Sequence, residues 1–194
     1  MLVIGNGESR KNIDINEIHG VKVGCNAIFR DYNNINHIIC VDKRMVNEAL
    51  KVNANSNSTF IYTRKEWIDR YHNREHIRLV PKLPYKGDQR ADDPFQWGSG
   101  PYAVLLAAKH DKEVKMIGFD LYSKTNNTNN IYKDTDNYNT SNKRAVDPRY
   151  WIHQIGQVFK WYPKRKFTIY QLDNWQIPQN WKLANVSVDY IDNL

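Results

Sequence analysis

The first residues of the chain that could do chemistry form a glycine-rich turn. Gly5, Asn6, Gly7 and Ser9 follow an apolar run at residues 1–4, which predicts a buried strand. A strand that runs into such a turn can place backbone N–H groups against a phosphate. The pattern is neither GxGxxG nor a Walker loop, so an ordinary strand-to-helix turn is the alternative. We expect a nucleotide-type ligand at the carboxyl end of this first strand.

A second segment of small residues begins the clearest predicted helix. Ser99 and Gly100 stand between Gly98 and Pro101, and proline in the first turn is a typical helix start. Free N–H groups at a helix start attract anions, and small side chains let a ligand approach the backbone closely. The same residues would also suit a tight helix start without a ligand. The sequence therefore offers two candidate phosphate sites, one after Gly5 and one at Ser99.

Amide and carboxylate side chains follow three further apolar runs. Asn26, Asp42 and Asp120 come directly after the runs at residues 21–25, 37–41 and 114–119. In a doubly wound sheet the ligand lies beyond the carboxyl ends of the strands, where these side chains would gather. Each of them could equally be a turn former or a helix cap. Together they predict a polar site at one edge of the sheet.

His153, Tyr122 and Tyr132 carry groups that could move a proton. His153 lies at the edge of the apolar stripe of a predicted helix over residues 147–162, where a general base could sit. A half-buried structural histidine would occupy the same position. Tyr122 and Tyr132 flank or belong to a polar segment at residues 123–143. Their hydroxyls could donate to a leaving phosphate, or the rings could only anchor the segment.

These residues are set in a pattern of short apolar runs that alternate with helical segments. The alternation predicts an α/β fold, a single Rossmann-like domain over residues 1–194 with a mostly parallel sheet and helices on both faces. The polar segment at residues 123–143 predicts a short lid loop. Aromatic residues in the tail at 173–194 predict that it packs on the body. The expected strands cover residues 1–4, 21–25, 37–41, 59–62, 114–119 and 167–172, and residues 77–83 are expected to be extended. The expected helices cover residues 44–52, 65–71, 98–108 and 147–162.

The bulk composition bounds the partners of this chain. Its 194 residues carry a net charge of +7, which favours anionic partners such as nucleotides. The lysines and arginines are scattered and no nucleic-acid motif is present, so we expect no nucleic-acid partner. A non-catalytic binder of nucleotides or nucleic acid stays open as a third hypothesis. Cys25 and Cys40 are expected to be buried free thiols, and no spacing indicates a metal site.

Segments that would direct the chain to a membrane are not expected. No apolar stretch reaches the roughly 18 residues needed to cross a bilayer, and the first residues do not resemble a signal peptide. We therefore expect no integral membrane segment and a cytoplasmic location. A small domain with exposed aromatic residues could also associate as a homo-oligomer.

Taken in order, the motifs resemble those of the bacterial sialyltransferases of glycosyltransferase family 42. Each motif is short, so the resemblance rests on their order and spacing over residues 1–122 and 147–160. The matching residues are Gly5-Asn6-Gly7-Glu8-Ser9, Cys25-Asn26, Gly98-Ser99-Gly100-Pro101-Tyr102-Ala103, Ile117-Gly118-Phe119-Asp120-Leu121-Tyr122 and His153.

This resemblance implies an enzyme that binds CMP-sialic acid and transfers the sugar to a hydroxyl of a glycan acceptor, with inversion and without a metal cofactor. It implies that His153 takes the acceptor proton and that Tyr122 and Tyr132 hydrogen-bond the departing phosphate. The segment at residues 123–143 would close over the donor and exclude water. The nucleotide would be held by Asn6, Asn26, Ser99 and Gly100, with Gly5, Gly7, Ser9, Asp42 and Asp120 also at the site.

Asp42 and Gln96 depart from that family, which has asparagine and arginine near these positions. A carboxylate beside a phosphate repels it unless the carboxylate is protonated or paired with a cation. Asp42 fits a second resemblance better, to the pterin pyrophosphokinase-like proteins. There a carboxylate at a strand end can hold Mg²⁺ between ATP phosphates. His153 fits the transferase better, so an ATP- and Mg²⁺-dependent pyrophosphokinase stays as the alternative.

Overall fold

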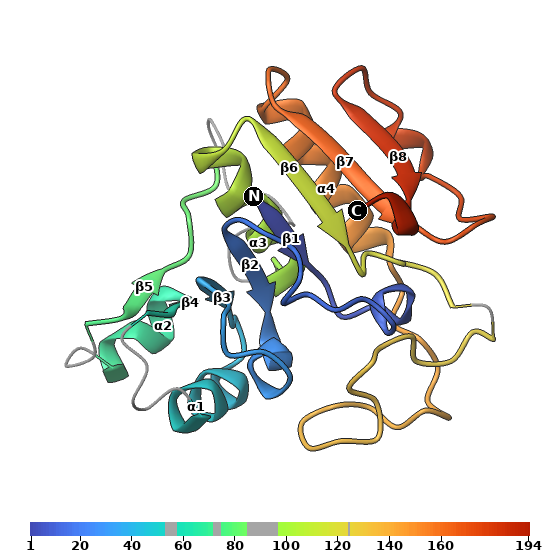
Figure 1. Cartoon of the computed structure of the whole chain (residues 1–194). Helices are drawn as coiled ribbons and strands as arrows, with labels where there is room; N and C mark the ends of the chain where they lie inside the picture. Colours follow the sequence, from blue (N-terminus) through green and yellow to red (C-terminus); the bar gives the residue numbers. More distant parts are fainter. Residues whose placement is uncertain (53–57, 72–74, 85–96, 124) are drawn as a thin grey trace.

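One parallel sheet is the frame of the molecule (Figure 1). The computed structural model describes residues 1–52, 58–71, 75–84, 97–123 and 125–194, and within them eight strands pair in the order β5-β4-β3-β2-β1-β6-β7-β8. Every neighbouring pair is parallel. The order runs outward from β1 in both directions, which is the predicted doubly wound, Rossmann-like arrangement. The strands are β1 (Leu2–Ile4), β2 (Lys22–Cys25), β3 (His37–Ile39), β4 (Phe60–Thr63), β5 (Ile77–Leu79), β6 (Glu113–Ile117), β7 (Lys166–Gln171) and β8 (Val186–Tyr190).

Both faces of the central strands are buried, which explains their continuous apolar runs. In β1, Leu2 and Ile4 pack into one core, whereas Val3 between them packs into the other. Strands β2 and β6 flank β1 in parallel register, with Val23 and Met116 opposite Val3. The carboxyl ends of these three strands therefore meet at one edge of the sheet.

Two long helices cover one face of the sheet, the rear face in Figure 1. They are α3 (Ser99–His110) and α4 (Arg149–Trp161). Residues 101–108 of α3 are all buried because this helix lies between the sheet and α4. Only the first turn of α3 is left to meet a ligand, at the edge where the strands end.

The other face is covered by α1 (Lys43–Val52) and by short 3-10 turns. Helix α1 buries Met45, Val46 and Ala49 against the strands. The predicted cover of helices on both faces is thus confirmed. The remaining short elements are α2 (Lys65–Ile68) and the turns η1 (Glu8–Arg10), η2 (Asn26–Arg30), η3 (Asp69–Tyr71), η4 (Gln179–Trp181) and η5 (Ile191–Asn193).

The tail after residue 172 packs on the body, as predicted, and it also adds a strand that was not predicted. Trp181 is fully buried in the core beneath α4, and Ile191 is buried on the other face. Strand β8 pairs with β7 at the edge of the sheet and has mostly exposed side chains. An edge strand of this kind has no continuous apolar run, so the sequence gives little sign of it.

The polar segment at residues 123–143, of which residue 124 is outside the described part, is tied to the body at several points. Tyr132 is 4% exposed, and the Ile131 N–H donates to the Asn6 carbonyl oxygen at 2.9 Å. Arg30 in η2 donates to the Thr135 hydroxyl at 2.7 Å. These contacts fix the path of the segment beside the glycine turn, while closure over a ligand stays a prediction.

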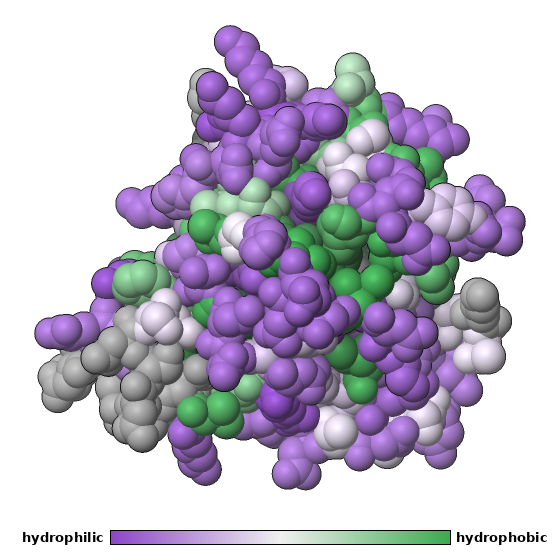
Figure 2. All heavy atoms as spheres, in the orientation of Figure 1, coloured by the Kyte–Doolittle hydropathy of each residue, from purple (hydrophilic) through white to green (hydrophobic). Residues whose placement is uncertain are grey.

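The surface of the molecule is mainly polar. Figure 2 shows hydrophilic side chains over most of one face and a group of hydrophobic ones near its centre. Within the described ranges, no helix combines the length and the apolar character that crossing a membrane requires.

Candidate functional site

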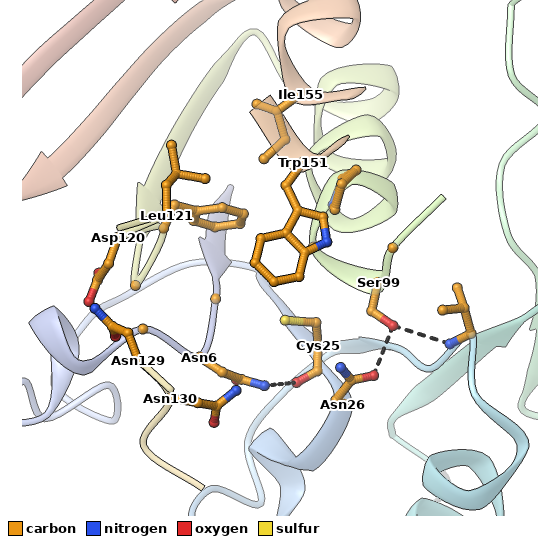
Figure 3. Close-up of a pocket in the computed structure, with 18 of the residues that line it drawn as sticks. Asn6, Cys25, Asn26, Ser99, Asp120, Leu121, Asn129, Asn130, Trp151 and Ile155 are labelled. Carbon is orange, nitrogen blue, oxygen red and sulfur yellow. Dashed lines mark hydrogen bonds between the residues drawn. The ribbon is translucent and has the colours of Figure 1, made fainter. Parts of the chain in front are cut away.

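A pocket of about 350 Å³ opens beyond the carboxyl ends of β1, β2, β3 and β6. The start of α3 and the first turns of α4 form its other side, where Trp151 and Ile155 line it (Figure 3). It lies where the strand order reverses between β1 and β6, the usual ligand position in doubly wound sheets. Of the predicted site residues, the pocket is lined by Gly5, Asn6, Gly7, Asn26, Asp42, Ser99, Gly100 and Asp120.

The glycine turn after β1 is hydrogen-bonded to the end of β6. The Gly5 N–H donates to the Ile117 carbonyl oxygen at 2.8 Å, and the Gly7 N–H donates to the Gly118 carbonyl oxygen at 2.9 Å. The turn therefore lines the pocket, but these two N–H groups already have acceptors. A phosphate could use them only by breaking bonds that join two neighbouring strands.

Ser9 and Asp120 fasten this turn to the end of β6. The Ser9 N–H donates to Asp120 Oδ2 at 2.9 Å, and the Ser9 hydroxyl donates to Asp120 Oδ1. A Cβ at Gly7 would overlap the Asp120 carboxylate, and a Cβ at Gly5 would overlap the Gly118 carbonyl. The contacts of Ser9 and Asp120 are therefore those of a structural latch. Their binding of a nucleotide stays a prediction.

Asn6 points its amide between β2 and the polar segment. Its Nδ2 donates to the Cys25 carbonyl oxygen at 3.3 Å and to the Tyr138 hydroxyl at 3.2 Å. Its Oδ1 is buried and has no hydrogen-bond partner. A buried acceptor without a donor is costly, so this oxygen is a natural place for a ligand donor.

Asn26 and Ser99 join the end of β2 to the start of α3. The Ser99 hydroxyl donates to Asn26 Oδ1 at 2.8 Å and accepts from the Val41 N–H at 3.2 Å (Figure 3). Asn26 has a φ of 51°, a left-handed conformation that asparagine tolerates better than most residues. The arrangement holds the Asn26 side chain at the pocket with its amide nitrogen unused by any described residue.

The first N–H groups of α3 lie at the pocket without an acceptor. Gly98 caps this 12-residue helix, and its own N–H donates to Gln154 Oε1 at 3.3 Å. The N–H groups of Ser99 and Gly100 make no hydrogen bond to any described residue. The N-terminus of a helix also carries a partial positive charge. This end of the pocket can therefore bind an anion.

Two carboxylates give the rest of the pocket a negative character. Asp42 forms an ion pair with Arg44 at 3.2 Å, and its Oδ1 accepts the Arg44 N–H at 3.1 Å, so Asp42 caps α1. Among the described residues that line the pocket there is no lysine or arginine. Burial raises the pKa of the Cys25 thiol to about 12, so this side chain is neutral. Among the described lining residues, the groups that attract an anion are thus the N–H groups at the start of α3.

Tyr132 lies outside the pocket, in a cluster that anchors the polar segment. Its hydroxyl donates to Asp31 Oδ2 at 2.6 Å and accepts from the Arg10 guanidinium at 3.2 Å. Burial, followed by the hydrogen bond to Asp31, raises the pKa of this phenol. The structure does not bring Tyr132 to the residues that line the pocket, and its contacts are those of an anchor.

Tyr122 and His153 are also absent from the pocket wall. Tyr122 is 42% exposed and lines a second, adjoining pocket. His153 is exposed on α4, and the helical period places it about 200° around the axis from both Trp151 and Ile155, which line the first pocket. Proton transfer by His153 stays a prediction, and this geometry does not direct it into the first pocket.

Sequence reasoning missed several lining residues. Trp151 is the largest, and its ring projects into the pocket from the first turn of α4 (Figure 3). Asn129 and Asn130 reach the pocket from the polar segment, and Leu121 follows Asp120. The available signal was a tryptophan on the polar side of a predicted amphipathic helix, because tryptophan is usually buried. In the structure Trp151 is 36% exposed.

No family model, curated protein or solved structure matches the chain. Within the described residues, no group of three or more His, Cys, Asp or Glu side chains is arranged to hold a metal ion. The resemblance to sialyltransferases thus rests on the motifs themselves.

Proposed function

We propose that the pocket between β1, β6 and α3 binds a CMP-activated sugar and that the protein is a sialyltransferase-like glycosyltransferase. The observation that carries the proposal is the pair of N–H groups at Ser99 and Gly100, which have no acceptor among the described residues. They stand at a helix N-terminus, where backbone donors and the helix dipole together favour a phosphate. The position at the switch point of the sheet supports the same ligand class.

The charge of the pocket favours a ligand with one phosphate group. A nucleoside triphosphate brings three or four negative charges, whereas a CMP-sugar has a single phosphodiester. Asp42 and Asp120 line the pocket, and the described lining residues include no lysine or arginine to balance a triphosphate. Asp42, which favours ATP with Mg²⁺ in the sequence, shares its carboxylate with Arg44. The charges therefore favour the transferase over the pyrophosphokinase.

The side chains around the helix start suit a nucleoside. The buried Asn6 Oδ1 offers an acceptor, and the Asn26 amide nitrogen offers a donor. Cytosine presents an amino donor next to ring acceptors, so the two amides could pair with it. The half-exposed indole of Trp151 supplies an aromatic surface for the base or the sugar.

The proposed reaction is a displacement at the anomeric carbon of the donor. The acceptor hydroxyl oxygen forms the new bond, the bond to the phosphate oxygen breaks, and CMP leaves with the electron pair. The acceptor proton passes to a base, and His153 is the residue predicted for this role from the sequence, although it is not among the residues that line the pocket. His153→Ala should leave CMP affinity unchanged and remove transfer, and unchanged turnover would exclude His153 as the base.

A thermal-shift panel tests the ligand class first. CMP, CDP, UDP, GDP and ATP are each added with EDTA and, separately, with Mg²⁺. A ligand present at about 100 times its dissociation constant stabilises a protein by about 2.7 kcal/mol, which gives a clear shift in Tm. We expect CMP to raise Tm equally with EDTA and with Mg²⁺. A rise only with ATP and Mg²⁺ would favour the pyrophosphokinase, and no rise with any nucleotide would contradict both.

Asn26→Gly tests whether the Asn26 amide contributes to CMP binding. Glycine keeps the positive φ at this position, so the backbone is preserved while the amide is removed. We expect about tenfold weaker CMP binding by calorimetry, the equivalent of about one hydrogen bond. Lys164→Ala, an exposed change after α4, should leave CMP affinity as it is.

A further inference from the structure

A second pocket of about 490 Å³ adjoins the first, and Leu121 lines both. Leu121 has a φ of 63°, a conformation that residues other than glycine rarely adopt. Such conformations persist where the surrounding structure enforces them, and they gather at binding sites. The second pocket therefore lies next to the first, with the constrained backbone of Leu121 at their common wall.

Arg144 is held at this second pocket by its backbone. It forms an antiparallel bridge with Asn127, and the adjacent Ala145 N–H donates to the Asn126 carbonyl oxygen at 2.8 Å. Arg144 itself lines the pocket. A guanidinium on a fixed backbone loses less freedom when it binds a ligand than one on a loose loop.

The positive charge of Arg144 acts on Asp147, an acidic residue of the pocket wall, without an ion pair between the two in the described part of the chain. Asp147 is paired with Arg149 instead, with N–O distances of 2.6 and 2.7 Å. Arg144 forms no ion pair with any described residue. An unpaired guanidinium offers the two parallel donors that a carboxylate accepts.

The other walls of the second pocket suit a sugar ring. Tyr122 and Pro148 present ring surfaces for the C–H face of a pyranose, and Ser123 and Asn126 offer polar groups to its hydroxyls. Burial raises the pKa of the Tyr122 phenol, so its hydroxyl is a neutral donor. Apolar surface with a small number of polar and charged groups is the usual composition of a small-molecule site.

We propose that the second pocket binds an acidic sugar, whose carboxylate pairs with Arg144, as the acceptor of the transferase. The role of this sugar as the acceptor rests on the proposed function, whereas its binding in the second pocket does not. Leu121 lines both pockets, so the two sugars would lie next to each other at this residue.

Saturation-transfer NMR with two sugars tests the proposal. The probes are methyl β-glucuronide, which carries a carboxylate, and methyl β-glucoside, which has the same ring without it. We expect about tenfold tighter binding of the glucuronide, because a charge-assisted pair forms. Arg144→Ala should remove that difference, and Lys143→Ala, which removes a neighbouring positive charge outside the pocket wall, should retain it.

CMP is titrated in the same samples, so that the two proposals are judged separately. Glucuronide binding that depends on Arg144 and persists in the presence of CMP supports the second pocket, whether or not CMP binds. Equal binding of the two sugars would overturn it, and so would a preference that survives Arg144→Ala or displacement of the glucuronide by CMP. Absence of CMP binding contradicts the donor site alone.

Discussion

Two glycine-rich segments meet at the same pocket and resemble each other in sequence, yet the fold uses them differently. After β1, the N–H groups of Gly5 and Gly7 donate to carbonyl oxygens at the end of β6. At the start of α3, the N–H groups of Ser99 and Gly100 have no acceptor among the described residues. Gly5 and Gly7 of the first segment therefore clasp two neighbouring strand ends, and the second segment is the proposed anion site.

The difference follows from the hydrogen-bond acceptors that lie beside each segment. The end of β6 runs in parallel register next to β1, so carbonyl groups are in place for the N–H groups of the turn. The first N–H groups of a helix have no partner within the helix, whatever its sequence. Glycine at the first site permits close approach of backbone to backbone, and glycine at the second leaves room for a ligand.

The largest expected effect comes from adding one methyl group to each segment. Gly5→Ala should destabilise the fold by about 4 kcal/mol or more, because its Cβ would overlap the Gly118 backbone carbonyl. Gly100→Ala should cost less than about 1 kcal/mol, since its Cβ would meet only the Phe119 ring at 3.4 Å. Urea unfolding of both variants measures the difference. Equal costs would mean that the first turn is not clasped to β6.

The next largest effect is the difference in unfolding free energy between variants of the two carboxylates at the strand ends, Asp120 and Asp42. Asp120→Ala leaves the Ser9 N–H and hydroxyl without acceptors and should cost about 3 kcal/mol. Asp42→Ala removes only a helix cap and an exposed ion pair, for about 1 kcal/mol. The midpoints of urea unfolding give both values. A smaller loss for Asp120→Ala than for Asp42→Ala would contradict the latch.

A moderate effect is expected at Tyr132, which anchors the polar segment beside the clasp. Tyr132→Phe should cost about 1.5 kcal/mol at pH 8 through the loss of the bond to Asp31. The folded state raises the pKa of this phenol, so its contribution is complete below about pH 10 and is lost as pH rises further. Unfolding at pH 8 and pH 10.5 should therefore show a smaller difference between wild type and variant at the higher pH. A constant difference would argue against a neutral, buried hydroxyl.

The smallest effect is expected at the Arg30–Glu48 ion pair, on the outer side of the same anchor. The hydrogen bond from Arg30 lowers the pKa of Glu48. The stabilisation is thus present above about pH 4.5 and is lost as pH falls through the lower folded value. Glu48→Gln should cost about 0.5 kcal/mol at pH 7, since the pair is partly exposed, and less at pH 3. Acid unfolding curves that run parallel for the two proteins would exclude the pair as a contributor.

The sheet and the position of the site were predictable from the sequence, because buried parallel strands have continuous apolar runs. Polar residues after those runs had to meet at one edge, and Asn6, Asn26, Ser99 and Asp120 do line one pocket there. The segment at residues 123–143 was also recognisable as a separate polar loop. These features depend on local patterns and on the parallel order of strands.

The rest depended on tertiary contacts that no local pattern records. The N–H groups of Gly5, Gly7 and Ser9 are bonded to residues 117–120 at and after the end of β6, more than a hundred residues away in the sequence. Trp151 reaches the pocket and His153 does not because of the way α4 docks on α3. Strand β8 was missed because its side chains are mostly exposed.

We infer that a phosphate binds at the start of α3 and not at the glycine turn after β1. Amide NMR during a titration with CMP, and in parallel with cytidine, tests it without altering the protein. We predict that the largest shifts peculiar to CMP occur at the amides of Ser99 and Gly100, while those of Gly5 and Gly7 stay in place. Shifts that centre on Gly5 and Gly7, or identical responses to CMP and cytidine, would contradict the account.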